Sequence, residues 1–473
     1  MKILYVTSEV TPFAASGGLG DVLGALPRTV AERDGYECAV ILPLYSQIKP
    51  EYRQMMKKVD EFYFYLGYRS LYCGIWQIEK DGVTYFFVDN EYYFKRDKMY
   101  GQYDDGERFA YFSRAVIEVM AREIFLPDIM HANDWQSACA VEYLKLKYAS
   151  HPNLSAVKAV YTIHNIEYQG KYDMAILENV FDFDYSFKNV FEFDGCINLM
   201  KAAIVSCDVL TTVSPNYAKE LREPFFAFGL HNIIRENSYK MCGIINGIDT
   251  VYFSPENGDD IEYTYNADTF IEGKAKNKLA LQRELGLEEN ADIPMAVMIT
   301  RLTAGKGIDL VIHILDELLE QNMQFVMLGT GEYSYEEILS RICERHRDKA
   351  RALIKFDRVI SKHMYAAADI FIMPSKSEPC GLAQMTACRY GTIPVVRAVG
   401  GLADSIVNYG LDGSNGFVFA NFNAHELLFR IKDALSLYGV KDEWNALVRR
   451  AMTTDFTWEQ SAERYIDMYE KIN

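Results

Sequence analysis

The sequence predicts an α/β protein with two parallel-sheet lobes. Its 473 residues are too many for one ordinary domain, and 49% of them are hydrophobic, which is enough for two cores. Each half of the chain opens with a strand pattern, a glycine-containing loop and an amphipathic helix, which together begin a βαβ unit. A turn-rich stretch at residues 243–255 separates the two patterns and predicts a hinge.

The first half begins with a buried-strand pattern at residues 3–7. A glycine loop follows at residues 16–20, and then a helix with Asp21 near its N-terminus. Further strand patterns alternate with polar segments, as expected where each parallel strand is followed by a helix. These strand predictions cover residues 38–42, 128–131, 159–164 and 209–213.

The second half repeats this plan. A strand is predicted at residues 295–300 and a polar loop at 301–307, before a helix with one apolar face. The other strand predictions cover residues 324–328, 353–356, 369–373 and 393–397, and the chain ends in an amphipathic helix at 458–472. We therefore expect an N-terminal lobe of residues 1–243, completed by the C-terminal helix 458–473, and a C-terminal lobe of residues 250–457.

Aromatic side chains are dense between residues 62 and 112. Aromatic faces stack on sugar rings, so a glucan groove is one interpretation of this segment. Packing within half-buried strands is the other, and we expect it for most of these residues because tyrosine suits such strands.

Charge and cysteine usage exclude some functions. A net charge of −17 and a pI near 5.1 disfavour binding to nucleic acid or to an anionic membrane, although such acidity also serves plain solubility. Nine dispersed cysteines without a CxxC pair indicate reduced thiols and no metal cluster. We expect a cytoplasmic protein, since no signal peptide precedes the first strand and no apolar run is long enough to cross a bilayer.

Gly17-Gly18 forms the first of four candidate ligand segments. Two glycines after a strand allow a ligand close to the backbone, and their N–H groups with the helix N-terminus favour an anion. A tight turn would use the same residues. The loop lacks the GxGxxG pattern, and no acidic residue stands where the ribose of NAD would bind, which disfavours a dehydrogenase.

Arg301 and Lys306 lie in a loop between a predicted strand and a predicted helix. A guanidinium fork, an ammonium and a helix N-terminus are the groups that a diphosphate needs. Solvated surface charge is the alternative for this pair.

The third segment, residues 374–382, leaves a strand and enters a helical pattern at residues 383–389. Here Glu378 would accept hydrogen bonds from sugar hydroxyls, and the N–H groups of Gly381 and Leu382 would face the ligand. The alternative is an acid that only stabilises the helix start.

The fourth segment is Thr162-Ile163-His164-Asn165, and Asp134 follows a neighbouring strand in the same way. Ligands bind at the carboxyl ends of parallel strands, which makes His164 and Asp134 candidates. A structural role is the commoner one for a single histidine or aspartate in such a place.

Taken in order, these segments resemble those of the bacterial glycogen synthases and plant starch synthases that use ADP-glucose. The resemblance covers essentially the whole chain. The segments that carry it are residues 16–19, 133–135, 162–165, 212–215, 245–249, 301–307 and 374–382.

The resemblance implies the GT-B fold, in which two Rossmann-like lobes face each other across a cleft. It implies retaining transfer of glucose from ADP-glucose to the non-reducing end of an α-1,4-glucan such as glycogen, without a cofactor or metal. UDP-glucose remains an alternative donor, and a homo-oligomer is compatible with the sequence. Retention follows either from a carboxylate nucleophile or, as the resemblance implies, from front-face attack assisted by the His164 carbonyl.

The resemblance also implies residue roles. Arg301 and Lys306 would hold the diphosphate, Glu378 the glucose hydroxyls, and His164 would lie beside the reacting sugar; these four are the catalytic candidates. Asp134 would bind a glucose hydroxyl, and Phe356 would lie against the adenine. The full substrate-binding set is Gly18, Asp21, Asp134, Asn165, Asn246, Phe356, Cys380, Gly381 and Leu382.

Ala15 departs from the family pattern, because it stands where the loop Lys-x-Gly-Gly-Leu has its lysine. Gln136 likewise replaces a histidine often seen after Asp-Trp. The missing lysine leaves open a second function, a catalytically inactive protein of the same fold that binds nucleotide-sugar or glucan. A third possible function is a phosphorylase, in which a lysine would form a Schiff base with pyridoxal phosphate. A dehydrogenase is the fourth and the least favoured.

Overall fold

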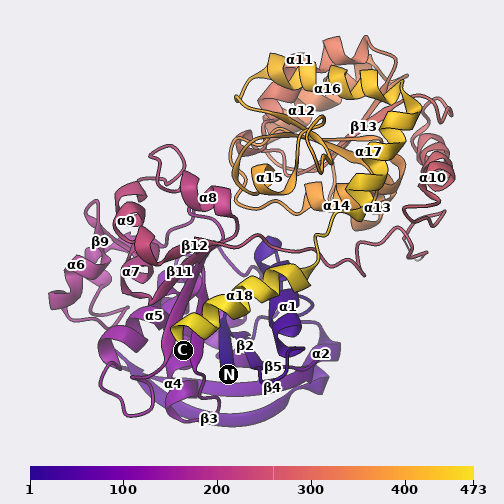
Figure 1. The fold of residues 1–473 in the computed structure, drawn as a ribbon. Helices are drawn as coiled ribbons and strands as arrows, with labels where there is room; N and C mark the ends of the chain where they lie inside the picture. Colours follow the sequence, from indigo (N-terminus) through magenta and orange to yellow (C-terminus); the bar gives the residue numbers. More distant parts are fainter. Residues whose placement is uncertain (259) are drawn as a thin grey trace. The chain divides into compact units, whose positions relative to one another are not determined.

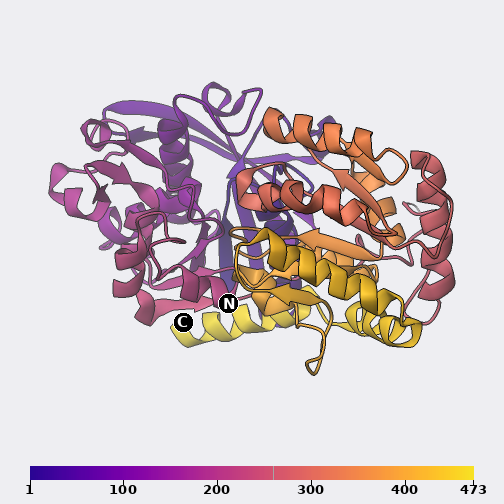
Figure 2. The same cartoon turned by 90° about the horizontal axis from the view of Figure 1, so that it is seen from above.

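The computed structural model describes residues 1–258 and 260–473. The chain forms two compact units (Figure 1). The first comprises Met1–Asn246 together with Trp458–Asn473, and the second comprises Gly247–Thr457. Both chain termini therefore belong to the first unit (Figure 2).

The first unit is built on a nine-stranded sheet with the order β12-β11-β7-β6-β1-β2-β5-β4-β3. Its pairs are parallel except β3–β4 and β4–β5, which are antiparallel. The strands are β1 (Lys2–Val6), β2 (Glu37–Pro43), β3 (Lys57–Leu66), β4 (Arg69–Lys80), β5 (Val83–Asp89), β6 (Ile129–Asn133), β7 (Lys158–Ile163), β11 (Val209–Thr212) and β12 (Met241–Gly243). A small second sheet contains β8 (Lys171–Asp173), β9 (Glu192–Phe193) and β10 (Cys196–Asn198).

Helices pack on this sheet through apolar stripes. In α1, Val22, Leu23 and Leu26 are all buried, and the C-terminal helix α18 packs against α1 with Tyr465 and Tyr469 buried. The main helices of the unit are α1 (Gly18–Ala31), α2 (Pro50–Met55), α3 (Glu91–Phe94), α4 (Asp105–Ala121), α5 (Trp135–Glu142), α6 (Lys188–Phe191), α7 (Leu199–Ser206), α8 (Pro215–Glu220), α9 (His231–Glu236) and α18 (Trp458–Ile472).

The second unit has a six-stranded parallel sheet with the order β15-β14-β13-β16-β17-β18. Its strands are β13 (Met295–Ile299), β14 (Gln324–Leu328), β15 (Ala350–Leu353), β16 (Ile370–Met373), β17 (Ile393–Arg397) and β18 (Phe417–Phe419). Its helices are α10 (Phe270–Leu285), α11 (Ile308–Leu319), α12 (Tyr333–Arg345), α13 (Arg358–Ala367), α14 (Ala383–Arg389), α15 (Gly400–Ser405), α16 (Ala424–Tyr438) and α17 (Lys441–Thr453).

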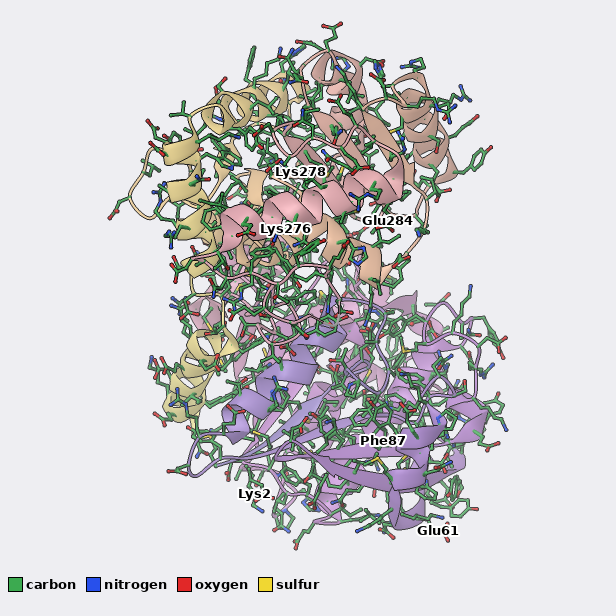
Figure 3. The ribbon with its side chains drawn as sticks, turned by 90° about the vertical axis from the view of Figure 1, so that its right-hand side faces the viewer. Lys2, Glu61, Phe87, Lys276, Lys278 and Glu284 are labelled. Atoms are coloured by element: carbon green, nitrogen blue, oxygen red, sulfur yellow. The ribbon has the colours of Figure 1, made fainter. Side chains whose placement is uncertain are left out.

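One buried ion pair fixes α10 to this sheet. The ammonium of Lys278 lies 2.6 Å from the carboxylate of Asp369, directly before β16, and also donates to two carbonyls. Lys276, two residues earlier on the same helix (both lysines are labelled in Figure 3), instead pairs with Glu272 at the exposed surface. Lysines in one helix thus serve both the core and the solvent side.

Two sequence predictions need adjustment. The strand expected at residues 353–356 lies at Ala350–Leu353, because the chain turns at Lys355 and Asp357 then caps α13 by accepting the N–H groups of Val359 and Ile360. The aromatic segment 62–112 is strand only in part: it contains the second half of β3 and all of β4 and β5, and then enters α3 and α4. Within the described residues, no helix has the length and apolarity that a membrane span requires.

Candidate active site

The glycine loop before α1 is held by a buried carboxylate. Glu9, only 5% exposed, accepts hydrogen bonds from the Ser16 N–H at 2.5 Å, the Ser16 hydroxyl at 2.7 Å, the Gly17 N–H at 3.1 Å and the Tyr100 hydroxyl at 2.7 Å. The expectation that both glycine N–H groups serve an anion is therefore wrong for Gly17, whose N–H is taken by Glu9. Gly18 begins α1, so its N–H is one of the donors that a helix N-terminus leaves free.

Sequence reasoning missed Glu9. Its position in the sequence could have identified it, because Glu9 lies three residues beyond β1, at the same edge of the sheet as the other candidates. Asp21, which was predicted, lies in the first turn of α1.

Asp134 joins the ends of β6 and β7. Its carboxylate accepts the N–H of His164 at 2.8 Å and, more weakly, the N–H of Asn165 at 3.4 Å. Three predicted site residues from two strands therefore form one cluster at the carboxyl edge of the first sheet.

The backbone and the charge of Asp134 are both unusual. Its φ of 56° and ψ of 178° lie in a region that residues with a side chain rarely adopt, at a cost of roughly 1–3 kcal/mol. Burial raises the pKa of Asp134 to about 7, against the opposing effect of the two backbone N–H donors. Strain and desolvation at one residue are typical of functional sites.

The hydrogen bonds of Asn133 define the protonation of His164. The Asn133 amide nitrogen donates to the carbonyls of Val6 and His131, so its oxygen faces His164 Nε2, 2.9 Å away. Nε2 must then carry the proton, and Nδ1 is left as an acceptor. Burial lowers the pKa of His164 to about 3, which keeps this imidazole neutral at physiological pH.

A second histidine lies one layer deeper. His131 on β6 contacts the Tyr469 hydroxyl of α18 at 2.7 Å and the Thr162 hydroxyl of β7 at 2.6 Å, and both partners are buried. The C-terminal helix is thereby linked to the two strands that carry Asp134 and His164. No periodicity in the sequence signals this link, because its partners are 338 residues apart.

In the second unit, Lys306 and Glu378 form an ion pair. Their charged atoms are 2.6 Å apart, and the Ser375 hydroxyl donates to the same Glu378 oxygen at 2.9 Å. Arg301 directly follows the turn after β13, and its side chain is exposed and makes no hydrogen bond or ion pair with any residue that the structure describes. The loop after β13 thus carries one paired cation, Lys306, and one cation without a partner among the described residues, Arg301.

The two loops that carry these residues pack tightly. Gly307 has a φ of 73°, and a Cβ there would lie 2.2 Å from the Pro374 carbonyl oxygen. The Lys376 N–H donates to the Gly305 carbonyl at 2.9 Å. Only glycine at position 307 permits this approach.

Gly400 and Gly401 support the Glu378 loop from behind. The Gly401 N–H donates to the Glu378 carbonyl at 3.1 Å, and a Cβ at Gly400 would lie 1.9 Å from that oxygen. Gln384 of α14 donates to the carbonyls of Cys380 and Gly381, which fixes the backbone of this loop against α14. Sequence reasoning missed these supporting residues.

Two predicted residues lie outside both clusters. Phe356 follows β15 with 81% of its side chain exposed, 6.0 Å from the guanidinium of Arg358. Asn246 is 4% exposed, and its side-chain oxygen has no hydrogen-bond partner among the residues described. An exposed ring and an unsatisfied amide oxygen are both available to a ligand.

Known proteins match the chain over its whole length. Residues 2–236 match a family described as the starch synthase catalytic domain, and residues 284–450 match glycosyl transferases group 1. Proteins called glycogen synthase from Clostridium novyi (strain NT) and Geobacillus stearothermophilus are each 44% identical over 100% of this chain and over 99% and 98% of their own length.

A solved structure agrees in fold. The catalytic domain of starch synthase IV from Arabidopsis thaliana, bound to ADP and acarbose, has a TM-score of 0.91 and 33% identity over 99% of both chains. The two parallel-sheet units are therefore the lobes of a GT-B fold, as the sequence predicts. The chain belongs to the glycogen and starch synthase family of glycosyltransferases.

Proposed function

We propose that this chain transfers the glucosyl group of ADP-glucose to the non-reducing end of an α-1,4-glucan, with retention of configuration at the anomeric carbon. Identity of 44% to glycogen synthases over the whole chain supports glucosyl transfer to a glucan. The ADP and acarbose bound by the Arabidopsis relative support ADP-glucose as donor and an α-glucan as acceptor. The observation that carries the proposal is the Lys306–Glu378 pair with the unpaired Arg301 nearby in sequence.

The donor diphosphate is assigned to Arg301 and Lys306. The free guanidinium of Arg301 can bind two phosphate oxygens at once, and Lys306 retains two N–H donors beyond the one directed at Glu378. Negative charge grows on the diphosphate as the glycosidic bond breaks, so fixed cations stabilise the transition state more than the bound substrate. The Gly18 N–H adds a donor, and the exposed ring of Phe356 offers a face for the adenine.

The glucosyl group is assigned to Glu378 and the loop behind it. Lys306 and Ser375 occupy one Glu378 oxygen, while Oε1 makes no hydrogen bond with the described residues and is free to accept from a sugar hydroxyl. The N–H groups of residues 380–382 complete this site. Asp21, Asn165 and Asn246 are assigned further substrate contacts.

We assign the reaction a front-face course. The alternative route needs a carboxylate nucleophile. Asp134 is the carboxylate beside His164, but burial raises its pKa to about 7, so a large part of it is protonated near neutral pH and cannot attack, and two backbone N–H groups hold its Oδ1. In front-face attack the acceptor's 4-hydroxyl oxygen bonds to the anomeric carbon as the diphosphate leaves, and a phosphate oxygen takes the hydroxyl proton.

His164 then acts as a neutral group. Its backbone carbonyl stabilises positive charge on the sugar, and its Nδ1 accepts a hydrogen bond from a sugar hydroxyl. A neutral imidazole suits this role, because an imidazolium beside a developing oxocarbenium ion would oppose the reaction. Asp134 binds a glucose hydroxyl while it anchors the His164 backbone. Nine free cysteines support a reducing, cytoplasmic setting for this chemistry.

Transfer of labelled glucose to glycogen tests the proposal. ADP-glucose and UDP-glucose are supplied together at equal concentration, and the product is digested to establish its linkage. We expect α-1,4-linked product mainly from ADP-glucose. Absence of transfer from either donor, with nucleotide-sugar still bound, would instead identify the catalytically inactive binding protein that Ala15 leaves open.

A further inference from the structure

The side chain of Asn133, the last residue of β6, is buried and uses both of its N–H donors. Its nitrogen donates to the carbonyls of Val6 on β1 and His131 on β6, at 3.2 and 3.1 Å. Its oxygen accepts a hydrogen bond from Nε2 of His164 at 2.9 Å. With 2% of the residue exposed, water does not compete for these bonds.

The amide of Asn133 has one possible orientation. A reversed amide would set its oxygen against the carbonyl oxygens of Val6 and His131 and would lose both of these hydrogen bonds. The backbone of Asn133 is held as well, because its N–H donates to the Ser137 hydroxyl at 2.6 Å. The strand carbonyls therefore decide that an oxygen, not an NH2 group, faces the ring of His164.

Two consecutive residues hold His164. The Asn133 amide binds its ring, and the Asp134 carboxylate accepts its backbone N–H at 2.8 Å. Neighbouring residues of a regular strand point to opposite faces of the sheet, so a regular strand could not direct both side chains to one histidine. The φ of 56° at Asp134 ends this alternation directly after Asn133. The strained backbone of Asp134 thus allows both contacts.

The second ring nitrogen of His164, Nδ1, makes no hydrogen bond with any residue that the structure describes. With the proton held on Nε2, Nδ1 carries a lone pair and a partial negative charge. The opposite tautomer would place an N–H group, and hence a partial positive charge, at the same position. The contact with Asn133 therefore sets the sign of the charge that Nδ1 presents.

We propose that Asn133 is a positioning residue for glucosyl transfer, which fixes the tautomer and the ring orientation of His164 so that the Nδ1 lone pair faces the transferred sugar. The inference rests on the proposed function, in which positive charge develops on that sugar. A lone pair stabilises this charge, whereas the N–H of the other tautomer would oppose it. Because the charge is largest in the transition state, loss of Asn133 should lower kcat more than it raises KM.

The test compares two buried asparagines in the full-length protein. Asn133→Ala removes the acceptor of the Nε2 proton, and Asn277→Ala on α10 is the matched control. The Asn277 side chain, 5% exposed, also donates to two carbonyls, those of Tyr263 and Gly273, and accepts one N–H, that of Tyr263. Both variants should therefore lose similar stability, which thermal unfolding measures, but only Asn133→Ala removes a contact with His164.

Nitrogen NMR of protein labelled with nitrogen-15 histidine observes the tautomer directly, because protonated and unprotonated ring nitrogens have widely separated chemical shifts. The spectrum of His164→Gln assigns the His164 signals among those of the eight histidines. At neutral pH we expect the parent to show a protonated Nε2 and an unprotonated Nδ1. In Asn133→Ala the two signals should move toward each other, because both tautomers become populated.

Steady-state kinetics with ADP-glucose and glycogen provide the second measurement. We expect the kcat of Asn133→Ala to fall at least about tenfold, which corresponds to roughly 1.4 kcal/mol, while its KM for ADP-glucose changes by less than about threefold. The kcat of Asn277→Ala should stay within about twofold of that of the parent.

An Nδ1–H or mixed tautomer in the parent would overturn the proposal, and this spectrum decides even if Asn133→Ala does not fold. A parent-like spectrum in Asn133→Ala, or equal losses of kcat in the two variants, would overturn it as well. If the parent transfers no glucose, the proposed function fails, but the nitrogen spectra still show whether Asn133 fixes the tautomer of His164.

Discussion

The ammonium nitrogen of Lys306 lies 2.6 Å from a carboxylate oxygen of Glu378, although the two residues are 72 positions apart. The pair joins the loop after β13 to the loop after β16, and Ser375 donates to the same oxygen. Removing such charges from water is costly, so a half-buried pair contributes little net stability. In the function proposed above, the pair holds a cation and a carboxylate at fixed positions for a charged, hydroxylated substrate.

Arg301→Ala and Lys306→Ala should each lower kcat/KM with ADP-glucose by roughly a hundredfold or more. Loss of one cation from the leaving diphosphate costs about 3 kcal/mol of transition-state stabilisation. Steady-state kinetics with glycogen as acceptor measure the effect. Lys355→Ala, which removes an exposed cation paired with Asp357, is the control and should retain activity. Near-parental turnover in both site variants would remove the diphosphate assignment.

Asp134→Asn should stabilise the protein at alkaline pH and abolish most transfer. The folded-state pKa of Asp134 is raised to about 7, so the native state holds a proton that the unfolded state has lost, and stability falls as pH rises from about 4 to 7. An amide removes this penalty but cannot take the carboxylate's place toward a sugar hydroxyl. Free energies of unfolding in urea at pH 8 and pH 5 should show an advantage of the variant over the parent that is larger at pH 8 by at least about 1 kcal/mol.

Glu142→Gln separates the effect on stability at alkaline pH from the effect on glucosyl transfer. This buried carboxylate of α5 accepts the Ser206 hydroxyl and also has a pKa raised by burial, to about 8, but it lies outside the candidate site. The variant should gain stability at pH 8 and retain transfer. If Asp134→Asn also kept full activity, the sugar contact assigned to Asp134 would be wrong.

Sequence periodicity was sufficient to place most of the site at the correct ends of strands. His164 follows β7, Asp134 follows β6 and Arg301 closely follows β13, because buried strands and polar loops leave a local pattern. The buried face of α11 was predictable for the same reason. These inferences use only residues close together in the chain.

The supporting contacts could not be predicted, because they join residues that are far apart in sequence. Tyr469 meets His131 across 338 residues, and Gly401 meets the Glu378 carbonyl only after the loops have folded together. In the sequence, Glu9 looks like any other acidic residue that follows a strand. Only the folded loop shows that its carboxylate accepts the hydrogen bond of the Gly17 N–H. The positions of strands can be predicted from residues that are close in sequence, whereas the contacts that support the loops form only in the tertiary structure.

Acid should destabilise the protein through its buried histidines. Burial lowers the folded-state pKa of His164 and of His131 to about 3. Between pH 6.5 and pH 3 the unfolded state therefore binds more protons than the folded state, and the free energy of unfolding decreases as the pH decreases. Each histidine should cost about 1 kcal/mol between pH 7.5 and pH 5.5. Urea unfolding of His164→Gln at both pH values should show a smaller loss than the parent.

His425→Gln serves as the control for that comparison, because His425 is exposed at the start of α16. It should lose stability between the two pH values by as much as the parent does. An equal loss in His164→Gln would show that His164 titrates alike in the folded and unfolded states, and the neutral imidazole of the proposed mechanism would then be untenable.

Ala15→Lys should leave the fold intact and change the kinetics of the donor. Ala15 is exposed and precedes Ser16 and Gly17, whose N–H groups are already held by Glu9, so a longer side chain can extend without moving the loop. A cation added near Gly18 should raise kcat/KM for ADP-glucose by up to about fivefold, or about 1 kcal/mol. Ala15→Gln supplies length without charge and should match the parent. If kinetics with ADP-glucose and UDP-glucose both stay unchanged in Ala15→Lys, position 15 plays no part in donor binding, and Arg301 and Lys306 suffice.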